Sequence, residues 1–201
     1  TKEIAGVRCV VTYDLDYEED ELIEAEVAFF AQDDDGNVWR MGEYPEEYDE
    51  GTVAAAPAWM HGVQGAIAGL TMWAKPEVGS RSFSEGWAPS VDFTDRGRVR
   101  EFVAEDCVPV DCYKNVLVIE ENTASEPDAF QLKYWARGVG NTRVGWAGAA
   151  GSQESLQLVS LEQLDATELA KVHEGAMKLE KSGYEMSKDV YGQTPAMEMR
   201  K

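Results

Sequence analysis

The chain has 201 residues, of which 44% are hydrophobic, so it is long and apolar enough to bury the core of a sizeable domain. Its 38 acidic and 18 basic residues give a net charge of −20, which argues against binding of nucleic acid or anionic lipid through a basic surface. No run of about 18 apolar residues occurs, so no transmembrane segment is predicted. The acidity indicates either a well-solvated surface or one that collects cations or a basic partner.

The first part of the chain, about residues 4–45, alternates apolar and polar residues with the period of two that β-strands show. Predicted strands cover residues 6–17, 23–32 and 38–44. Residues 19–22, with the sequence EDEL, form the first predicted turn. These segments predict an antiparallel β-meander.

The second turn, with Asp33, Asp34 and Asp35 ahead of Gly36, suggests two structures. A calcium loop of the EF-hand type needs a glycine at its sixth position, whereas Gly36 is fourth from Asp33. Asp-Gly between alternating apolar runs is a strong hairpin signal. We therefore predict a hairpin tip and no metal site, with Asp33 and Asp35 as metal ligands in the alternative.

A segment rich in Gly, Ala and Pro follows at about residues 52–90 and is predicted to be loop packed over the core. It contains Trp59, His61, Trp73 and Trp87. The tryptophans are expected to be mainly core residues. If the sheet curls into an open barrel, these four residues are candidates for lining a ligand pocket.

Residues of about 108–148 echo the first unit. Both contain a Val-x-Cys phrase, and both contain two aromatic residues before an alanine and a nearby Gly-Asn. We interpret them as two related β units, although two unrelated meanders could share such phrases. The equivalent places of Cys9 and Cys112 make this pair the disulfide candidate, with Cys107–Cys112 as the competing pair.

The C-terminal part, residues 165–201, is predicted to be a helix and an extended tail packed on the β domain of residues 1–164. Asp165 and Glu168 have the spacing of a capping box, and Gly183 is a candidate helix stop. The predicted apolar stripe, expected on the outer face of the sheet, comprises Leu169, Val172, Ala176 and Leu179. The predicted fold class is thus mainly β, an antiparallel meander that forms an open or partial β-barrel from two related units, with one C-terminal α-helix.

The phrases "EIAGVRCVV", "FFAQDDDGNVWRMGE", "KPEVGS" and "YWARGVG" together resemble a family of uncharacterised bacterial extracytoplasmic β proteins, which are secreted or lipid-anchored. The resemblance covers nearly the whole chain. It implies an extracytoplasmic location, whether periplasmic, secreted or lipid-anchored. It also implies further strands ahead of Ile4, so one edge of the sheet near Thr1 would be open to a partner strand or to the tail. Because the shared phrases are structural, the resemblance carries no catalytic residues.

Signals of catalysis are missing from the sequence. Neither His61 nor His173 has a partner at metal-ligand spacing, and no nucleophile elbow or phosphate-binding glycine motif occurs. We expect no catalytic residues and no cofactor. The first hypothesis is a non-enzymatic domain that binds a ligand or protein. The alternatives are a structural subunit completed by a partner strand, and an unrecognised enzyme that uses carboxylates and His61.

Overall fold

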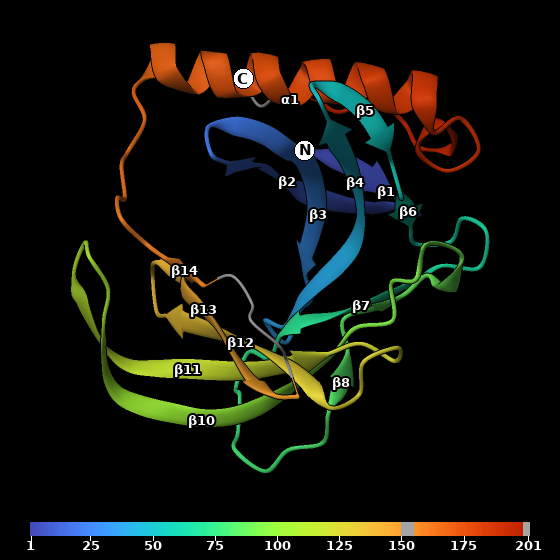
Figure 1. Cartoon of the computed structure of the whole chain (residues 1–201). Helices are drawn as coiled ribbons and strands as arrows, with labels where there is room; N and C mark the ends of the chain where they lie inside the picture. The colour runs from blue at the N-terminus through green and yellow to red at the C-terminus, as the bar shows by residue number, and fades with distance from the viewer. Residues whose placement is uncertain (150–154, 199–201) are drawn as a thin grey trace. The chain divides into compact units, whose positions relative to one another are not determined.

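The computed structural model describes residues 1–149 and 155–198. The described chain is mainly β, with two antiparallel sheets and the C-terminal helix α1 (Ala166–Met186) (Figure 1). The predicted fold class is confirmed in these terms. Both sheets are open, because each strand order ends in an edge strand.

The chain forms two compact units. The first contains Thr1–Met72, Gly86–Phe93 and Leu164–Lys201, and the second contains Trp73–Glu85 and Thr94–Gln163. The sequence analysis grouped all strands up to residue 164 in one domain. In the structure, the helix and tail share a unit with the N-terminal strands, and the later strands form the other unit.

The sheet of the first unit has the order β1-β2-β3-β4-β7-β9, with β5 and β6 also paired to β4. Its strands are β1 (Lys2–Ile4), β2 (Val7–Glu18), β3 (Glu21–Gln32), β4 (Val38–Asp49), β5 (Thr52–Ala55), β6 (Trp59–Met60), β7 (Ile67–Met72) and β9 (Gly86–Trp87). The predicted meander therefore corresponds to β2, β3 and β4. The Gly-rich segment differs from the expected loop, since it contributes several short strands to this sheet.

The sheet of the second unit has the order β14-β13-β12-β11-β10-β8. Its strands are β8 (Phe83–Ser84), β10 (Arg96–Cys107), β11 (Cys112–Asn122), β12 (Ala129–Ala136), β13 (Gly140–Gly148) and β14 (Leu156–Gln157). The short helices η1 (Pro89–Val91) and η2 (Tyr191–Gln193) belong to the first unit.

The two meanders share a register irregularity that supports the repeat seen in the sequence. The aromatic-aromatic-alanine phrases, Phe29–Ala31 on β3 and Tyr134–Ala136 on β12, each face a β-bulge on the next strand. In both ladders the register shifts by one residue between the two aromatic residues. The extra residues are Met41 and Thr142, and both are buried.

The two bulged residues also have equivalent neighbours. The carbonyl of Met41 accepts a hydrogen bond from His61 N at 2.8 Å, just after β6. The carbonyl of Thr142 accepts one from Leu158 N at 2.8 Å, just after β14. The equivalence thus extends to the short strand beyond each bulge.

This register changes the alignment that the sequence suggested. Val11 on β2 and Val118 on β11 stand opposite the first aromatic residue of each phrase. Counting back two residues, Cys9 corresponds to Val116, and both are fully buried. Cys112 comes four residues too early to be the equivalent of Cys9.

The core of the first unit lies between its sheet and the C-terminal half of α1. Leu179 packs there with Phe29, Tyr44 and Tyr191. The helix begins with the predicted capping box of Asp165 and Glu168. Gly183 is not the stop: the helix continues to Met186.

Gly183 serves the core instead. A Cβ at Gly183 would lie 3.0 Å from the Tyr191 ring, so the glycine allows close packing of the tail on the helix. The tail then runs beside β1 as far as Glu198, while residues 199–201 of the predicted tail lie outside the described residues.

Candidate functional site

The most distinctive feature of the first unit is the open edge of β2. β1 pairs with β2 only from Val7 to Cys9. In the described ranges, no strand pairs with the rest of β2 on this side, although β2 continues to Glu18. An uncovered strand edge of this length is a surface that can accept another strand.

The ladder geometry indicates which backbone groups are free to pair. Ala5 and Gly6 form a two-residue turn, so the backbone of Val7 and Cys9 points toward β1. Backbone direction alternates along an antiparallel strand. The N–H and C=O groups farther along the open side therefore belong to Val11, Tyr13 and Leu15.

A groove with a volume of about 500 Å³ runs along this edge, between β2 and α1. It is lined by Thr1, Arg8, Cys9, Val10, Val11, Tyr13, Leu169, Val172, His173, Ala176, Met177, Met197 and Glu198. Most of these side chains are apolar. The groove therefore offers apolar surface directly beside unpaired backbone groups.

The N-terminal half of α1 forms the outer wall of the groove. The predicted stripe divides into two parts: Leu179 is 5% exposed, whereas Leu169 is 43% and Val172 is 36% exposed. The expectation that Leu169 packs on the sheet is wrong. Two apolar residues on the helix remain uncovered beside the open strand edge.

Gly175 sets the distance between the helix and β2. A Cβ there would lie 2.9 Å from the ring of Tyr13. The helix can therefore approach β2 at Tyr13, near the middle of the strand. The helix thus lies close to β2 at this point, and the strand edge beyond Cys9 remains unpaired in the described ranges.

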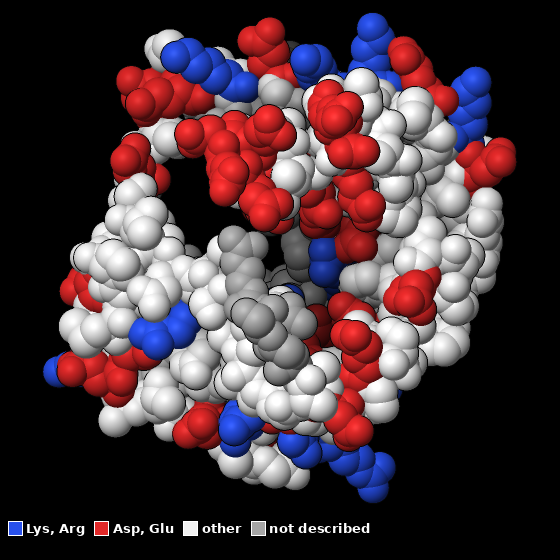
Figure 2. All heavy atoms as spheres, viewed as in Figure 1, with Lys and Arg blue, Asp and Glu red and all other residues white. Residues whose placement is uncertain are grey.

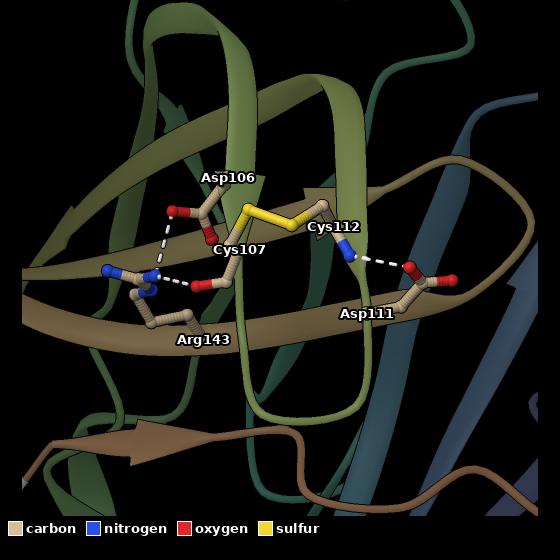
Figure 3. Close-up of a disulfide and its surroundings, with 5 residues drawn as sticks. All are labelled: Asp106, Cys107, Asp111, Cys112 and Arg143. Carbon is tan, nitrogen blue, oxygen red and sulfur yellow. Dashed lines mark hydrogen bonds and ion pairs between the residues drawn. A yellow bond between two sulfur atoms is a disulfide. The ribbon is translucent and has the colours of Figure 1, made fainter.

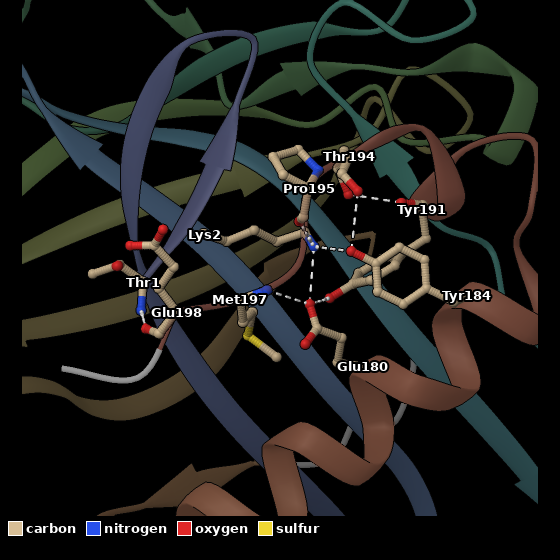
Figure 4. Close-up of polar contacts among 9 residues, drawn as sticks. All are labelled: Thr1, Lys2, Glu180, Tyr184, Tyr191, Thr194, Pro195, Met197 and Glu198. Carbon is tan, nitrogen blue, oxygen red and sulfur yellow. Dashed lines mark hydrogen bonds and ion pairs between the residues drawn. The ribbon is translucent and has the colours of Figure 1, made fainter. Parts of the chain in front are cut away.

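A buried polar cluster holds β1, α1 and the tail together at one end of the groove (Figure 4). Lys2 Nζ donates to Glu180 Oε1 at 3.1 Å, to the Tyr184 hydroxyl at 3.3 Å and to the Pro195 carbonyl at 2.7 Å. It lies 4.2 Å from the centre of the Tyr191 ring. Burial lowers the pKa of Lys2, and the hydrogen bond and charge of Glu180 oppose that shift.

The tail completes the sheet only beside β1. Glu198 N donates to the Thr1 carbonyl at 2.7 Å, and the Thr1 amino group donates to the Glu198 carbonyl at 2.8 Å. The tail is thus one occupant of the edge near Thr1 that the sequence analysis considered. It leaves β2 uncovered beyond Cys9.

The face of β2 that lies away from α1 is acidic. Asp14 stands directly opposite Glu26, and Asp16 stands opposite Glu24. Glu24 in turn faces Glu47 on β4. Like charges opposite each other on neighbouring strands repel, so this face is electrostatically unfavourable on its own.

The titration of these groups reflects their burial and, after it, that repulsion. Burial, followed by the charges of Glu26, Asp16 and Glu47, raises the pKa of Glu24 to about 7. Burial and the same kind of repulsion raise the pKa of Asp14. Figure 2 shows the gathering of acidic side chains over the β2–β3 hairpin.

Arg40 contributes positive charge to this face. It pairs with Glu26 at 2.8 Å and with Glu43 on its own strand. It lies on β4, two strands away from the open edge. Its charge opposes the rise in the pKa of Asp14 without cancelling it, and Asp14 and Asp16 lie on the edge strand itself.

The predicted ligand-binding residues are divided between the units. Trp59, His61 and Trp87 belong to the first, and Trp73 to the second. Trp59 is a core residue that packs on Phe93 with ring centres 4.9 Å apart.

The other three ligand candidates have separate surroundings. His61 Nδ1 accepts a hydrogen bond from Ala68 N at 3.1 Å. Trp87 is exposed, and Trp73 packs edge-on against Phe83 in the second unit.

The predicted disulfide Cys9–Cys112 is wrong. The bond joins Cys107 and Cys112, which face each other at the end of the β10–β11 hairpin (Figure 3). Arg143 supports that end, because it pairs with Asp106 at 2.9 Å and donates to the Cys107 carbonyl at 2.7 Å.

Cys9 remains a free, buried thiol on the wall of the groove. Burial raises its pKa to about 11, so it is protonated at neutral pH. A protonated, buried thiol is a poor nucleophile.

The predicted hairpin tip is confirmed, since β3 and β4 pair up to Gln32 and Val38 on either side of the loop. Asp33 accepts hydrogen bonds from Asn37 and from Trp39 Nε1, and these lower its pKa. In the part of the chain that the structure describes, no three His, Cys, Asp or Glu residues gather closely enough to hold a metal ion.

Sequence reasoning missed the groove. The signal was available in part, because Leu169 and Val172 belong to the predicted stripe, and Val10, Leu15 and Tyr17 continue the apolar residues of β2. Their exposure could not be inferred, since it depends on where α1 meets the sheet.

No protein-family model, curated protein or solved structure matches the chain. None of the helices in the described ranges combines the length and apolar character needed to cross a bilayer.

Proposed function

We propose that the first unit is a protein-binding module that captures an extended segment of a partner polypeptide as an added strand on β2. The open edge beyond Cys9, with apolar groove surface beside it, is the observation that carries this proposal. Strand addition satisfies a row of backbone groups at once, and side-chain pockets next to the edge add selectivity. A permanent partner would make the protein a structural subunit, and a transient one would make it a binding module.

The expected site of action is an oxidising, extracytoplasmic compartment. The Cys107–Cys112 disulfide supports this location, because such bonds persist mainly outside the cytoplasm. Peptide mapping without reduction tests it: material purified from its native source should contain the bond and a free Cys9. A fully reduced protein would argue against export.

Peptide selection combined with amide exchange tests strand addition. Peptides selected from a random display library on the folded protein should slow deuterium exchange at Val11, Tyr13 and Leu15. The amides of Thr12 and Asp14 point toward β3 and should be slow already in the free protein. They serve as an internal control on the same strand.

A blocking variant completes the test. Leu15→Pro removes an N–H on the open side only, a position where an edge strand tolerates proline. It should abolish peptide binding, while Leu15→Ala, which keeps the N–H, should retain most of it. Selected peptides that protect other parts of the protein, or that bind Leu15→Pro equally well, would contradict the proposal.

A further inference from the structure

The second unit contains a strand in the place that is open beside β2. The shared bulge makes β2 equivalent to β11, and β10 pairs along β11 from Arg96 to Cys107. By contrast, β1 covers β2 only as far as Cys9. The chain therefore shows what kind of strand sits on this side of a repeat when the place is filled.

That strand is rich in arginine. β10 begins with the sequence RGRVREFV, in which Arg96, Arg98 and Arg100 alternate with Gly97 and Val99. Arg98 and Arg100 pair with a carboxylate of the neighbouring strand, whereas Arg96 donates to Ser82.

Glu120 on β11 is the carboxylate that these two arginines bind. It is 6% exposed and pairs with Arg98 and, at 2.7 Å, with Arg100. In the shared register Glu120 corresponds to Tyr13, so β10 indicates the composition of the strand and not the positions of its charges.

The open edge in the first unit has an excess of negative charge. Asp14 and Asp16 lie on the edge strand itself, with Glu24 and Glu26 beside them on β3. A strand added to β2 would bring its own side chains within about 5 Å of Asp14 and Asp16. Basic side chains at those positions would relieve the repulsion.

The two faces of the added strand would meet different surfaces. Side chains pointing toward α1 would enter the groove beside Val11, Leu169 and Val172. Those pointing the other way would lie next to Asp14 and Asp16. Because side chains alternate along a strand, this requires a pattern of apolar and basic residues in turn.

We propose that the partner segment is an extended stretch in which Lys or Arg alternates with apolar residues, the basic ones facing Asp14 and Asp16. This inference rests on the proposed function. A second copy of β2 does not fit, because pairing two such edges would bring acidic residues together. The acidic face thus favours a basic partner and discourages self-association.

Two synthetic peptides test this charge preference. The first has the sequence of residues 96–103, RGRVREFV, with blocked ends, and the second has all three arginines replaced by glutamine. At low ionic strength the arginine peptide should bind about tenfold more tightly or better, and this difference should shrink with added salt. Amide exchange should place it on Val11, Tyr13 and Leu15.

Matched protein variants assign the effect to the edge. Asp14→Asn/Asp16→Asn should reduce the affinity ratio between the two peptides to near one. Asp34→Asn/Asp35→Asn makes the same charge change at the exposed β3–β4 loop and should leave the ratio unchanged.

The possible failures differ in meaning. Equal binding of both peptides at β2 would overturn the basic partner and leave strand addition intact. If neither synthetic peptide protects the amides of β2, the inference fails. If the library-selected peptides also leave those amides unprotected, the proposed function itself is rejected. Protection at β10 and β11 instead would show strand exchange in the second unit and overturn the inference.

Discussion

At the scale of single residues, the buried pair of Lys2 and Glu180 is the connection between the start of the sheet and the helix. Both side chains are almost completely buried, and Lys2 also contacts the tail through Pro195. Removing one partner would leave the other charge buried without compensation.

We therefore predict that Lys2→Met lowers the free energy of unfolding by about 3–5 kcal/mol. Adding Glu180→Gln should recover part of the loss, because the remaining charge is removed. Urea unfolding at neutral pH measures both. Lys171→Met, at an exposed lysine of α1, is the control and should change stability by less than about 0.5 kcal/mol. An equal effect of Lys2→Met and Lys171→Met would show that the pair is unimportant.

A second prediction concerns Glu24. Its pKa is about 7 in the folded protein against 4.5 ordinarily, so the folded state binds the proton more tightly than the unfolded state. Stability should therefore fall as pH rises from about 4.5 to about 7. Glu24→Gln removes this loss, so its melting temperature relative to wild type should increase between about pH 5 and about pH 8. A melting-temperature difference that stays constant over this pH range would contradict the assignment.

At the scale of elements, α1 is a helix of which only one half is packed. Leu179→Ala should cost about 2–5 kcal/mol, because it removes a buried side chain. Leu169→Ala should cost less than about 1 kcal/mol, since Leu169 is already exposed to solvent. Thermal and urea unfolding of the two variants provide the comparison. Equal losses would mean that the groove is closed in solution.

The elements themselves were largely predictable. Alternation identified β2, β3 and β4, and the Asp165–Glu168 pair identified the helix start. These signals are local, because each depends on neighbouring residues only. Gly183 was misinterpreted, since the same residue type ends helices and permits close packing, and only the position of Tyr191 distinguishes the two.

The pairing of cysteines was not predictable from similar phrases. Val-x-Cys occurs in both repeats, but the hydrogen-bonded register aligns Cys9 with Val116. Register is fixed by turns and bulges, which a short phrase does not contain. The groove could not be predicted either, because it depends on the short length of β1 and on the contact between α1 and β2 at Gly175.

At the scale of the whole molecule, the net charge of −20 is the dominant property. Repulsion among like charges destabilises a compact state, and salt screens it. Raising sodium chloride from about 0.02 M to about 0.5 M should therefore raise the melting temperature. Differential scanning calorimetry measures this shift. A melting temperature that falls with salt would mean that attractive ion pairs outweigh the repulsion.

The Lys2–Glu180 contact joins residues that are 178 positions apart in the chain. On the ribosome, β1 and β2 therefore emerge long before the helix and tail that complete their core. Residues 94–163 of the second unit are synthesised in one stretch, so we expect that unit to fold first. Until α1 is released, the sheet surface that later receives Leu179 and Tyr191 is bare, and exposed apolar surface of this kind makes a nascent chain prone to aggregation.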